Sequence, residues 1–197
     1  MLSAIDVSHH QLPSSLDWTG MRAAGCDVCI VRLTYGTRKD ELAREHVRLA
    51  RQHGFAIGAY AFVRTVEPAL DQAEAFFEAA YDADYGRPED LVMAVDVEDD
   101  TGKRPIAPGH APLFEEFVER MRGWKKTDPY VYITQRDYGR LGEPGWVLSL
   151  PLFVAHYASP SRKEPATPGG MPWAIWQHRV GPFDINGPSG YYKAPRM

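Results

Sequence analysis

The sequence predicts an α/β fold, a barrel-like sheet of mostly parallel strands that becomes irregular in its second half. Two observations support this prediction. Apolar segments of strand length alternate with longer segments that have helical apolar spacing, which is typical of parallel strands joined by crossover helices. The last third is rich in Pro and Gly and has few helical segments, so its strands are expected to be joined by loops. Because no repeat or linker divides the chain, we expect one domain over residues 1–197.

Each expected element follows from a local pattern. Residues 39–53 have the apolar spacing of an amphipathic helix with Gly54 at its C-cap, and Pro68 opens a second helix over about 67–81. A third helix is expected over residues 111–125. The apolar, β-branched runs predict strands at 3–7, 28–34, 55–63, 91–98, 130–134, 152–157 and 174–178.

Composition and charge exclude several classes of function. Hydrophobic residues make up 44% and charged residues 24% of the 197 positions, as in ordinary soluble globular proteins. A net charge of −4 argues against a nucleic-acid partner and against binding to an anionic membrane surface. No apolar run approaches the roughly 18 residues of a membrane span. The opening MLSAIDVSHH lacks the basic and apolar regions of a signal peptide.

Cys26 and Cys29 form a C-x-x-C motif, which raises the question of a redox or zinc site. A zinc site needs two further ligands nearby, and a redox pair normally opens a helix, whereas this pair opens an apolar strand. We therefore expect two reduced, buried thiols, no metal site and no cofactor.

Carboxylates gather at the ends of the predicted strands. VMAVDVEDD (92–100) is a strand that runs into four carboxylates, of which Asp96 and Glu98 are two residues apart and project from the same face. Asp6 ends the first strand and Asp184 follows the last one. Catalytic residues of α/β barrels lie at the carboxyl ends of the strands, so these side chains are expected to meet at one mouth.

Converging carboxylates suit glycoside hydrolysis. One protonated carboxyl donates to the leaving oxygen, while ionised neighbours stabilise positive charge at the sugar and raise the pKa of the donor. Two alternatives stay open at this point. Such acids can be solvated turn or capping residues, which we expect for Asp99 and Asp100. His and carboxylates at strand ends can also hold a divalent ion, which would suit a phosphodiesterase.

Stretches along nearly the whole chain resemble one known family. They are AIDVSHHQ (4–11), VRLTYGT (31–37), ARQHGFAIGAYAFVR (50–64), AVDVED (94–99), FVAHYA (153–158), and PWAIWQH followed by FDIN (172–186). In this order they resemble glycoside hydrolase family 25, the Chalaropsis-type lysozymes. The resemblance implies a flattened, incomplete TIM-like (β/α) barrel. It also implies hydrolysis of the β-1,4 bond between N-acetylmuramic acid and N-acetylglucosamine in bacterial peptidoglycan.

The resemblance also implies roles for individual residues. The family's D-x-E motif matches Asp96 and Glu98, and its second member is the general acid, so Glu98 is the expected acid. Asp96 would orient the substrate's N-acetyl group or tune Glu98. Asp6 matches the aspartate of the family's opening motif, and Asp184 matches the one after its W-Q strand. The mechanism implied is retaining, with the substrate's own acetamido group as nucleophile.

Aromatic and polar side chains near strand ends are expected to hold the sugars, although most aromatic residues of any chain belong to its core. The expected substrate-binding residues are Tyr60, Phe62, Tyr132, Tyr157, Trp176 and Gln177. Arg32 lies in an apolar strand and is expected to pair with the acidic cluster, because a buried unpaired charge is costly. Ala61 departs from the family, which commonly has His there.

Together these inferences predict a peptidoglycan-cleaving muramidase that acts as a monomer on the bacterial cell wall, in the periplasm or outside the cell. Because no signal peptide is visible, we expect export by lysis, by a specialised secretion system or through a lost leader. No motif specifies an immunity or delivery partner. A catalytically inactive glycan-binding barrel is the alternative, and a metal-dependent phosphodiesterase a more distant one.

Overall fold

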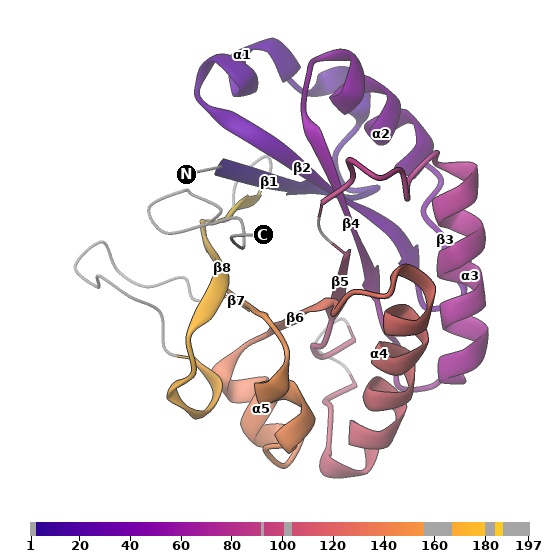
Figure 1. Ribbon diagram of the computed structural model, residues 1–197, viewed down its shortest axis with the longest axis vertical. Coiled ribbons are helices and arrows are strands. Elements are labelled where there is room, and N and C mark those ends of the chain that lie inside the picture. Colours follow the sequence, from indigo (N-terminus) through magenta and orange to yellow (C-terminus); the bar gives the residue numbers. More distant parts are fainter. Residues whose placement is uncertain (1–2, 92, 101–103, 156–166, 180–183, 187–197) are drawn as a thin grey trace.

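The strands of the computed structural model curl into a flattened barrel that carries its helices on the outside (Figure 1). The structure describes residues 3–91, 93–100, 104–155, 167–179 and 184–186. The strands are β1 (Ser3–Val7), β2 (Cys26–Tyr35), β3 (Arg38–Lys39), β4 (Ala56–Phe62), β5 (Met93–Asp96), β6 (Tyr130–Ile133), β7 (Leu152–Ala155), β8 (Trp173–Arg179) and β9 (Asp184–Asn186). The α-helices are α1 (Trp18–Ala23), α2 (Ala43–Gln52), α3 (Ala69–Asp82), α4 (Ala111–Lys125) and α5 (Gln135–Arg140).

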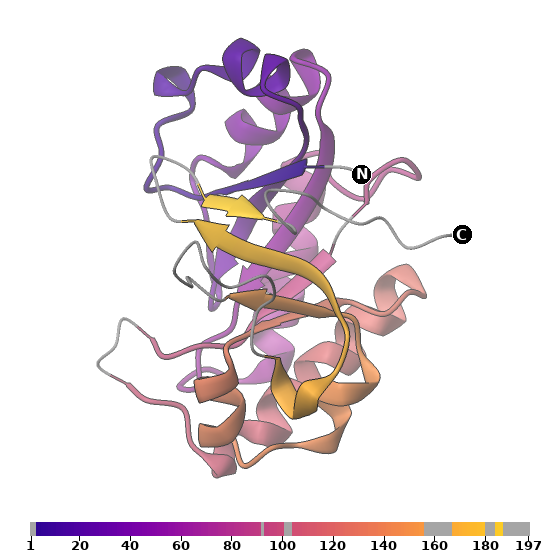
Figure 2. The same cartoon turned by 90° about the vertical axis from the view of Figure 1, so that its left-hand side faces the viewer.

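The strand pairings run round a ring. β1 pairs with β2, and the series continues through β4, β5, β6, β7 and β8, each parallel to its neighbour. β9 is antiparallel to both β8 and β1 and so joins the two ends of the series. Figure 2 shows the short yellow strand β9 lying between the longer golden strand β8 and the indigo strand β1. The carboxyl ends of the parallel strands therefore meet at one mouth, as the sequence predicts.

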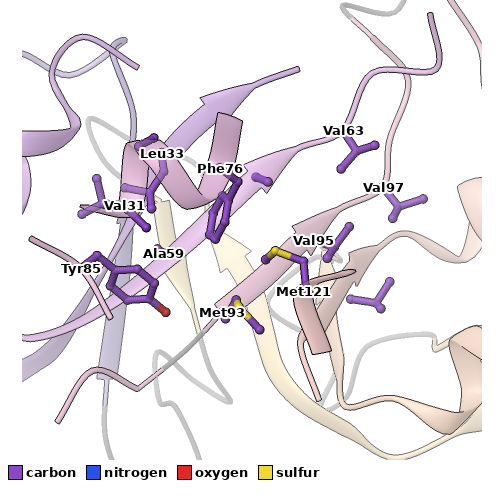
Figure 3. Close-up of a cluster of buried hydrophobic side chains, with 14 of the residues drawn as sticks. Val31, Leu33, Ala59, Val63, Phe76, Tyr85, Met93, Val95, Val97 and Met121 are labelled. Carbon is purple, nitrogen blue, oxygen red and sulfur yellow. The ribbon is translucent and has the colours of Figure 1, made fainter. Parts of the chain in front are cut away.

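Alternation along the strands separates two layers of side chains. Odd-numbered positions of β2 and β5, such as Val31 and Val95, face outward and pack with Phe76 of α3 and Met121 of α4 in the main core (Figure 3). Even-numbered positions of these two strands face the inside of the barrel. Side chains from several strands form a smaller apolar cluster there: Ala4, Val28, Ile30, Ala94, Tyr130, Phe153 and Ile175. The inner cluster leaves the mouth to polar side chains.

The predicted elements are confirmed with differences at their ends. Gly54 has φ +78°, the left-handed conformation expected of the residue that ends α2. This helix begins four residues later than expected, because Arg38 and Lys39 fold back on β2 as β3, and the Asp40 carboxylate accepts a bond from the Leu42 amide (3.0 Å). α1, β3, α5 and β9 were not predicted. α5 begins where the Thr134 hydroxyl accepts a bond from the Asp137 amide (3.0 Å).

Long apolar helices are absent from the described part of the chain: none of its helices could cross a membrane.

The two cysteines are buried, reduced thiols in β2, as expected. Burial, and then the negative charge of Asp6, raise the pKa of the Cys29 thiol, so its reactive thiolate form is suppressed. We expect a thiol reagent to label neither Cys26 nor Cys29 in the native protein, and to label both after unfolding in urea. Native-state labelling of either thiol at the rate of a free cysteine would contradict this expectation.

Candidate active site

Three of the predicted carboxylates line one pocket at the mouth of the barrel. Asp6 comes from the end of β1, Asp96 is the last residue of β5, and Glu98 follows two residues later. Asp6 and Asp96 occupy inward-facing positions of parallel strands, which is why residues so far apart in the sequence meet. The pocket encloses about 430 Å³, including its open mouth.

Aromatic side chains form the pocket walls. Tyr60 of β4, Tyr132 of β6 and Phe153 of β7 line it together with the carboxylates. Tyr132 pairs in register with Asp96 on the adjacent strand, and its ring meets that of Phe153 edge to face with 5.1 Å between centroids. Burial, and then the negative charge of Asp6, raise the pKa of the Tyr60 hydroxyl, so that it stays a hydrogen-bond donor beside the carboxylates.

The pocket continues into a wider cleft towards β1 and β2. This cleft encloses about 880 Å³, including its open mouth. Beyond the pocket residues Asp6, Tyr60, Asp96 and Glu98, its lining consists of Ser8, His10, Gln11, Arg32, Tyr35, Phe62 and Asp99. The carboxylates thus stand where the narrow and wide parts of one cleft meet.

Asp96 lies at the buried floor of the pocket, with 7% of its surface exposed. Its Oδ1 atom makes no hydrogen bond within the described part of the chain. Burial raises the pKa of Asp96 well above its ordinary value, the charges of Glu98 and Asp6 raise it further, and Arg32 opposes them. The carboxylate cluster therefore holds a proton at a pH where an isolated aspartate would have lost it.

Asp100 corrects one expectation, because it is buried rather than a solvated turn acid. Its side chain is 6% exposed and accepts hydrogen bonds from the Tyr35 hydroxyl and from Nε of Arg64 (3.1 Å). Burial alone raises the pKa of a carboxyl, but these two donors outweigh it and leave the pKa of Asp100 lowered. The carboxylate therefore stays ionised and ties the segment after β5 to β2 and to the end of β4.

Asp99 also differs from expectation and anchors the other side of this segment. Its side chain is 12% exposed, accepts a bond from the Ile106 amide (2.9 Å) and forms an ion pair with Arg140 of α5. Glu98 stands between this anchor and Asp96. The four carboxylates that end VMAVDVEDD thus divide into two that face the pocket and two that fix its rim.

Arg32 is paired, but its partner is Asp40 rather than the acidic cluster. Nε of Arg32 lies 2.9 Å from the Asp40 carboxylate, which also accepts a bond from the His9 amide (2.9 Å). The guanidinium contacts the His9 ring as well. Arg32 faces the inside of the barrel, so its charge still acts on Asp96 although it forms no ion pair with it.

The other predicted site residues are placed less completely. Phe62 lines the wider cleft and stacks on Tyr35 with 4.8 Å between ring centroids. Asp184 opens β9 and pairs in register with Asp6, which puts its backbone at the mouth. Trp176 and Gln177 lie in β8. The described part of the chain includes neither the side chains of these three residues nor any part of Tyr157.

Sequence reasoning missed Phe153 and Tyr35 as lining residues. The apolar run LFVAHY does not reveal which alternate positions face inward, because both faces of a parallel strand in a covered barrel are apolar. Tyr35 ends β2 after a shift in the register of the β2–β4 pairing between Arg32 and Thr34. The apolar pattern of the sequence does not indicate this shift. Within the described ranges, no three His, Cys, Asp or Glu side chains are grouped to hold a metal ion.

Comparisons with known proteins agree with this geometry. A family model described as Glycosyl hydrolases family 25 matches residues 5–181. The bacterial lysozyme from Streptomyces coelicolor is 25% identical, with 97% of this chain and 89% of that chain covered and a TM-score of 0.76. A family GH25 lysozyme from Aspergillus fumigatus is 21% identical, with 98% and 94% covered and a TM-score of 0.80. The muramidase from Acremonium alcalophilum is 22% identical, with 94% and 92% covered and a TM-score of 0.79. Among curated protein sequences, none matches this chain.

Proposed function

The chain belongs to glycosyl hydrolases family 25, and from this premise we propose that it is a muramidase. It cleaves the β-1,4 bond between N-acetylmuramic acid and N-acetylglucosamine in bacterial peptidoglycan. The observation that carries the proposal is the meeting of Asp6, Asp96 and Glu98 in one aromatic-walled pocket at the barrel mouth. A carboxyl cluster of this kind can protonate a glycosidic oxygen and stabilise the cation that forms.

Glu98 is the general acid in this proposal. It is half-buried at the pocket, whereas Asp96 lies on the buried floor, so Glu98 is the better placed to reach the bridging oxygen of a bound glycan. Its proton passes to O4 of N-acetylglucosamine as the bond from that oxygen to C1 of N-acetylmuramic acid breaks. Burial and the mutual repulsion of Asp96, Glu98 and Asp6 raise the pKa of Asp96, so the carboxyl pair Asp96–Glu98 retains one proton that can be used at this step.

The substrate's acetamido group acts as the nucleophile. Its carbonyl oxygen bonds to C1 as the leaving oxygen departs, giving a cyclic, positively charged intermediate. Asp96 and Asp6 stabilise that charge, with Asp184 as a fourth carboxylate. Water then attacks C1, Glu98 takes a proton from it, the ring opens, and the product keeps the β configuration.

The aromatic walls hold the sugars. Tyr132 and Tyr60 lie on either side of the carboxylates, and Phe62 and Tyr35 continue the wall along the wider cleft. Sugar rings present apolar C–H faces that pack on such rings. Trp176, Gln177 and Tyr157 complete this set in the proposal. The enzyme would act outside the cytoplasmic membrane, where its substrate is, as a monomer and without a cofactor.

Analysis of the products made from purified peptidoglycan tests the proposal. After digestion and borohydride reduction, mass spectrometry should find muropeptides that end in reduced muramic acid, in equal yield with and without EDTA. Fragments that end in reduced N-acetylglucosamine would contradict the bond assignment. Binding to peptidoglycan without any release would favour the inactive glycan-binding barrel, and loss of activity with EDTA would favour the metal-dependent alternative.

A further inference from the structure

A second hollow opens beside the cleft and takes no part in the mechanism above. It encloses about 440 Å³, including its open side, and is lined by His9, Arg32, Tyr35, Arg38, Lys39, Asp40 and Glu41. Arg32 and Tyr35 also line the wider cleft, so the two spaces share a wall. The hollow is therefore adjacent to the cleft in which a glycan would bind.

Several charges that line this second hollow are neutralised within the protein. Arg32 and Asp40 form a buried ion pair at 2.9 Å. Nζ of Lys39 turns to α3, where it lies 3.1 Å from Oε2 of Glu78 and 2.7 Å from Oδ2 of Asp82. These groups form the walls of the hollow and are already partnered.

Arg38 and Glu41 differ from the other charged groups of this hollow. Both are exposed, and within the described ranges neither forms an ion pair. Arg38 pairs with Tyr35 across the β2–β3 hairpin. The Arg38 guanidinium lies 5.5 Å from the centre of the Tyr35 ring, and this cation–π contact holds the guanidinium at the wall that the hollow shares with the cleft. The hollow thus offers one positive and one negative side chain to a ligand.

A ligand that uses both charges must itself carry both signs. The sugar backbone of peptidoglycan is uncharged, and a bare lactyl carboxylate would be attracted by Arg38 but repelled by Glu41. The stem peptide on the lactyl group of muramic acid carries carboxylates and, at its diamino acid, an ammonium group. Asp6, Asp96, Glu98 and Asp99 make the cleft itself strongly acidic, which favours placing stem carboxylates to its side.

We propose that this hollow is a subsite for the stem peptide of the substrate, with Arg38 binding a stem carboxylate and Glu41 an ammonium group. The inference rests on the proposed muramidase function and deepens it. It assigns to this chain a preference for glycan strands that carry peptides over strands that do not.

Kinetics on two matched substrates test the subsite. Soluble glycan strands are prepared with their stem peptides, and a portion is treated with an amidase that leaves only the lactyl carboxylate. We expect Arg38→Gln and Glu41→Gln each to raise KM on peptide-bearing strands by about two- to fivefold, the effect of one exposed ion pair. Their kcat, and their KM on trimmed strands, should equal those of wild type.

Two exposed residues of α4 provide matched controls, because Arg120→Gln and Glu116→Gln remove the same charges as Arg38→Gln and Glu41→Gln. Neither control should alter KM on either substrate. Equal KM values for wild type and Arg38→Gln on peptide-bearing strands would overturn the inference. A rise in KM on trimmed strands as large as that on peptide-bearing strands would overturn it too, because the lactyl carboxylate would then be the ligand.

Binding to the Glu98→Gln variant, measured by calorimetry, separates this inference from the proposed function because it needs no hydrolysis. Peptide-bearing strands should bind more tightly than trimmed strands, and adding Arg38→Gln should remove the difference. If both kinds of strand bind equally, the subsite is wrong even where the muramidase activity is confirmed. If wild type releases no muropeptides yet the binding difference is present, the proposed activity fails and the subsite stands.

Discussion

Glu98→Gln is expected to lower kcat on peptidoglycan by about 10³-fold, within the range that a general acid contributes. Glutamine keeps the size of the side chain and its place between Asp96 and the anchor at Asp99, but it has no acidic proton to donate to the leaving oxygen. KM and the thermal unfolding temperature should change little, because the side chain is half-buried at an open pocket. Release of reduced-end muropeptides at saturating substrate measures this effect.

A matched variant shows whether the loss is specific. Glu116 is an exposed glutamate on α4, outside every part of the cleft, and Glu116→Gln should keep full activity. If Glu98→Gln retained more than about a tenth of wild-type kcat, the acid role would have to move to Asp96, the other carboxyl of the pocket with a reason to hold a proton.

Asp96→Asn is expected to make the protein more stable at neutral pH while it lowers kcat by about 10²-fold or more. The carboxyl holds its proton more tightly when folded than when unfolded, because burial and then Glu98 and Asp6 raise its pKa. The stability that the protonated Asp96 carboxyl contributes is therefore fully present below the unfolded pKa of about 3.9. It falls as the pH rises from there to the folded pKa. Asparagine is neutral throughout, so the variant escapes this fall.

Thermal unfolding across pH measures the effect. Each unit by which the pKa is raised corresponds to about 1.4 kcal/mol, and each kcal/mol shifts the unfolding temperature of a chain this long by about 2–4 °C. We expect Asp96→Asn to match wild type near pH 3 and to exceed it by several degrees at pH 7. A variant less stable than wild type at pH 7 would mean that the ionised carboxylate is held by favourable contacts instead.

Asp100→Asn is the control of opposite sign. Tyr35 and Arg64 leave the pKa of Asp100 lowered, so the stability it contributes is present above the unfolded pKa and is lost as the pH falls through the folded pKa. Asp100→Asn should therefore destabilise the protein at pH 7, the reverse of Asp96→Asn. Both substitutions replace an aspartate by asparagine, at positions four residues apart. Opposite effects on stability would therefore come from the surroundings of each carboxylate and not from the loss of a charge as such.

Local sequence patterns predicted which side chains lie at the carboxyl ends of strands and which share one face of a strand. Asp6 and Asp96 end apolar strands, and parallel packing brings such ends together whatever the rest of the chain does. Tyr60 follows from the alternation of side chains along its strand, and Tyr132 from its place near the end of another strand. These residues could be placed without knowledge of their distant neighbours.

Long-range pairings could not be predicted in this way. Asp100 bonds to Tyr35, 65 residues earlier, and Asp99 pairs with Arg140, 41 residues later. Nothing in VMAVDVEDD distinguishes these carboxylates from solvated ones, because burial and partners are set only when the strands and α5 come together. Arg32 was correctly expected to be paired, but the choice of Asp40 depends on how the chain turns back through β3.

The antiparallel direction of β9 determines how long a connection the chain needs after β8 before a further strand can pair with β1. A ninth element parallel to β8 would need a crossover of a dozen or more residues, normally a helix, before it could reach β1. Because β9 runs antiparallel to β8, such a crossover is not required, and Asp184 follows Arg179 after only four positions of the sequence. The antiparallel direction also brings the first residue of β9 level with Asp6, the next-to-last residue of β1. The reversed direction of β9 therefore completes the ring of strand pairings and places a carboxylate-bearing residue level with Asp6.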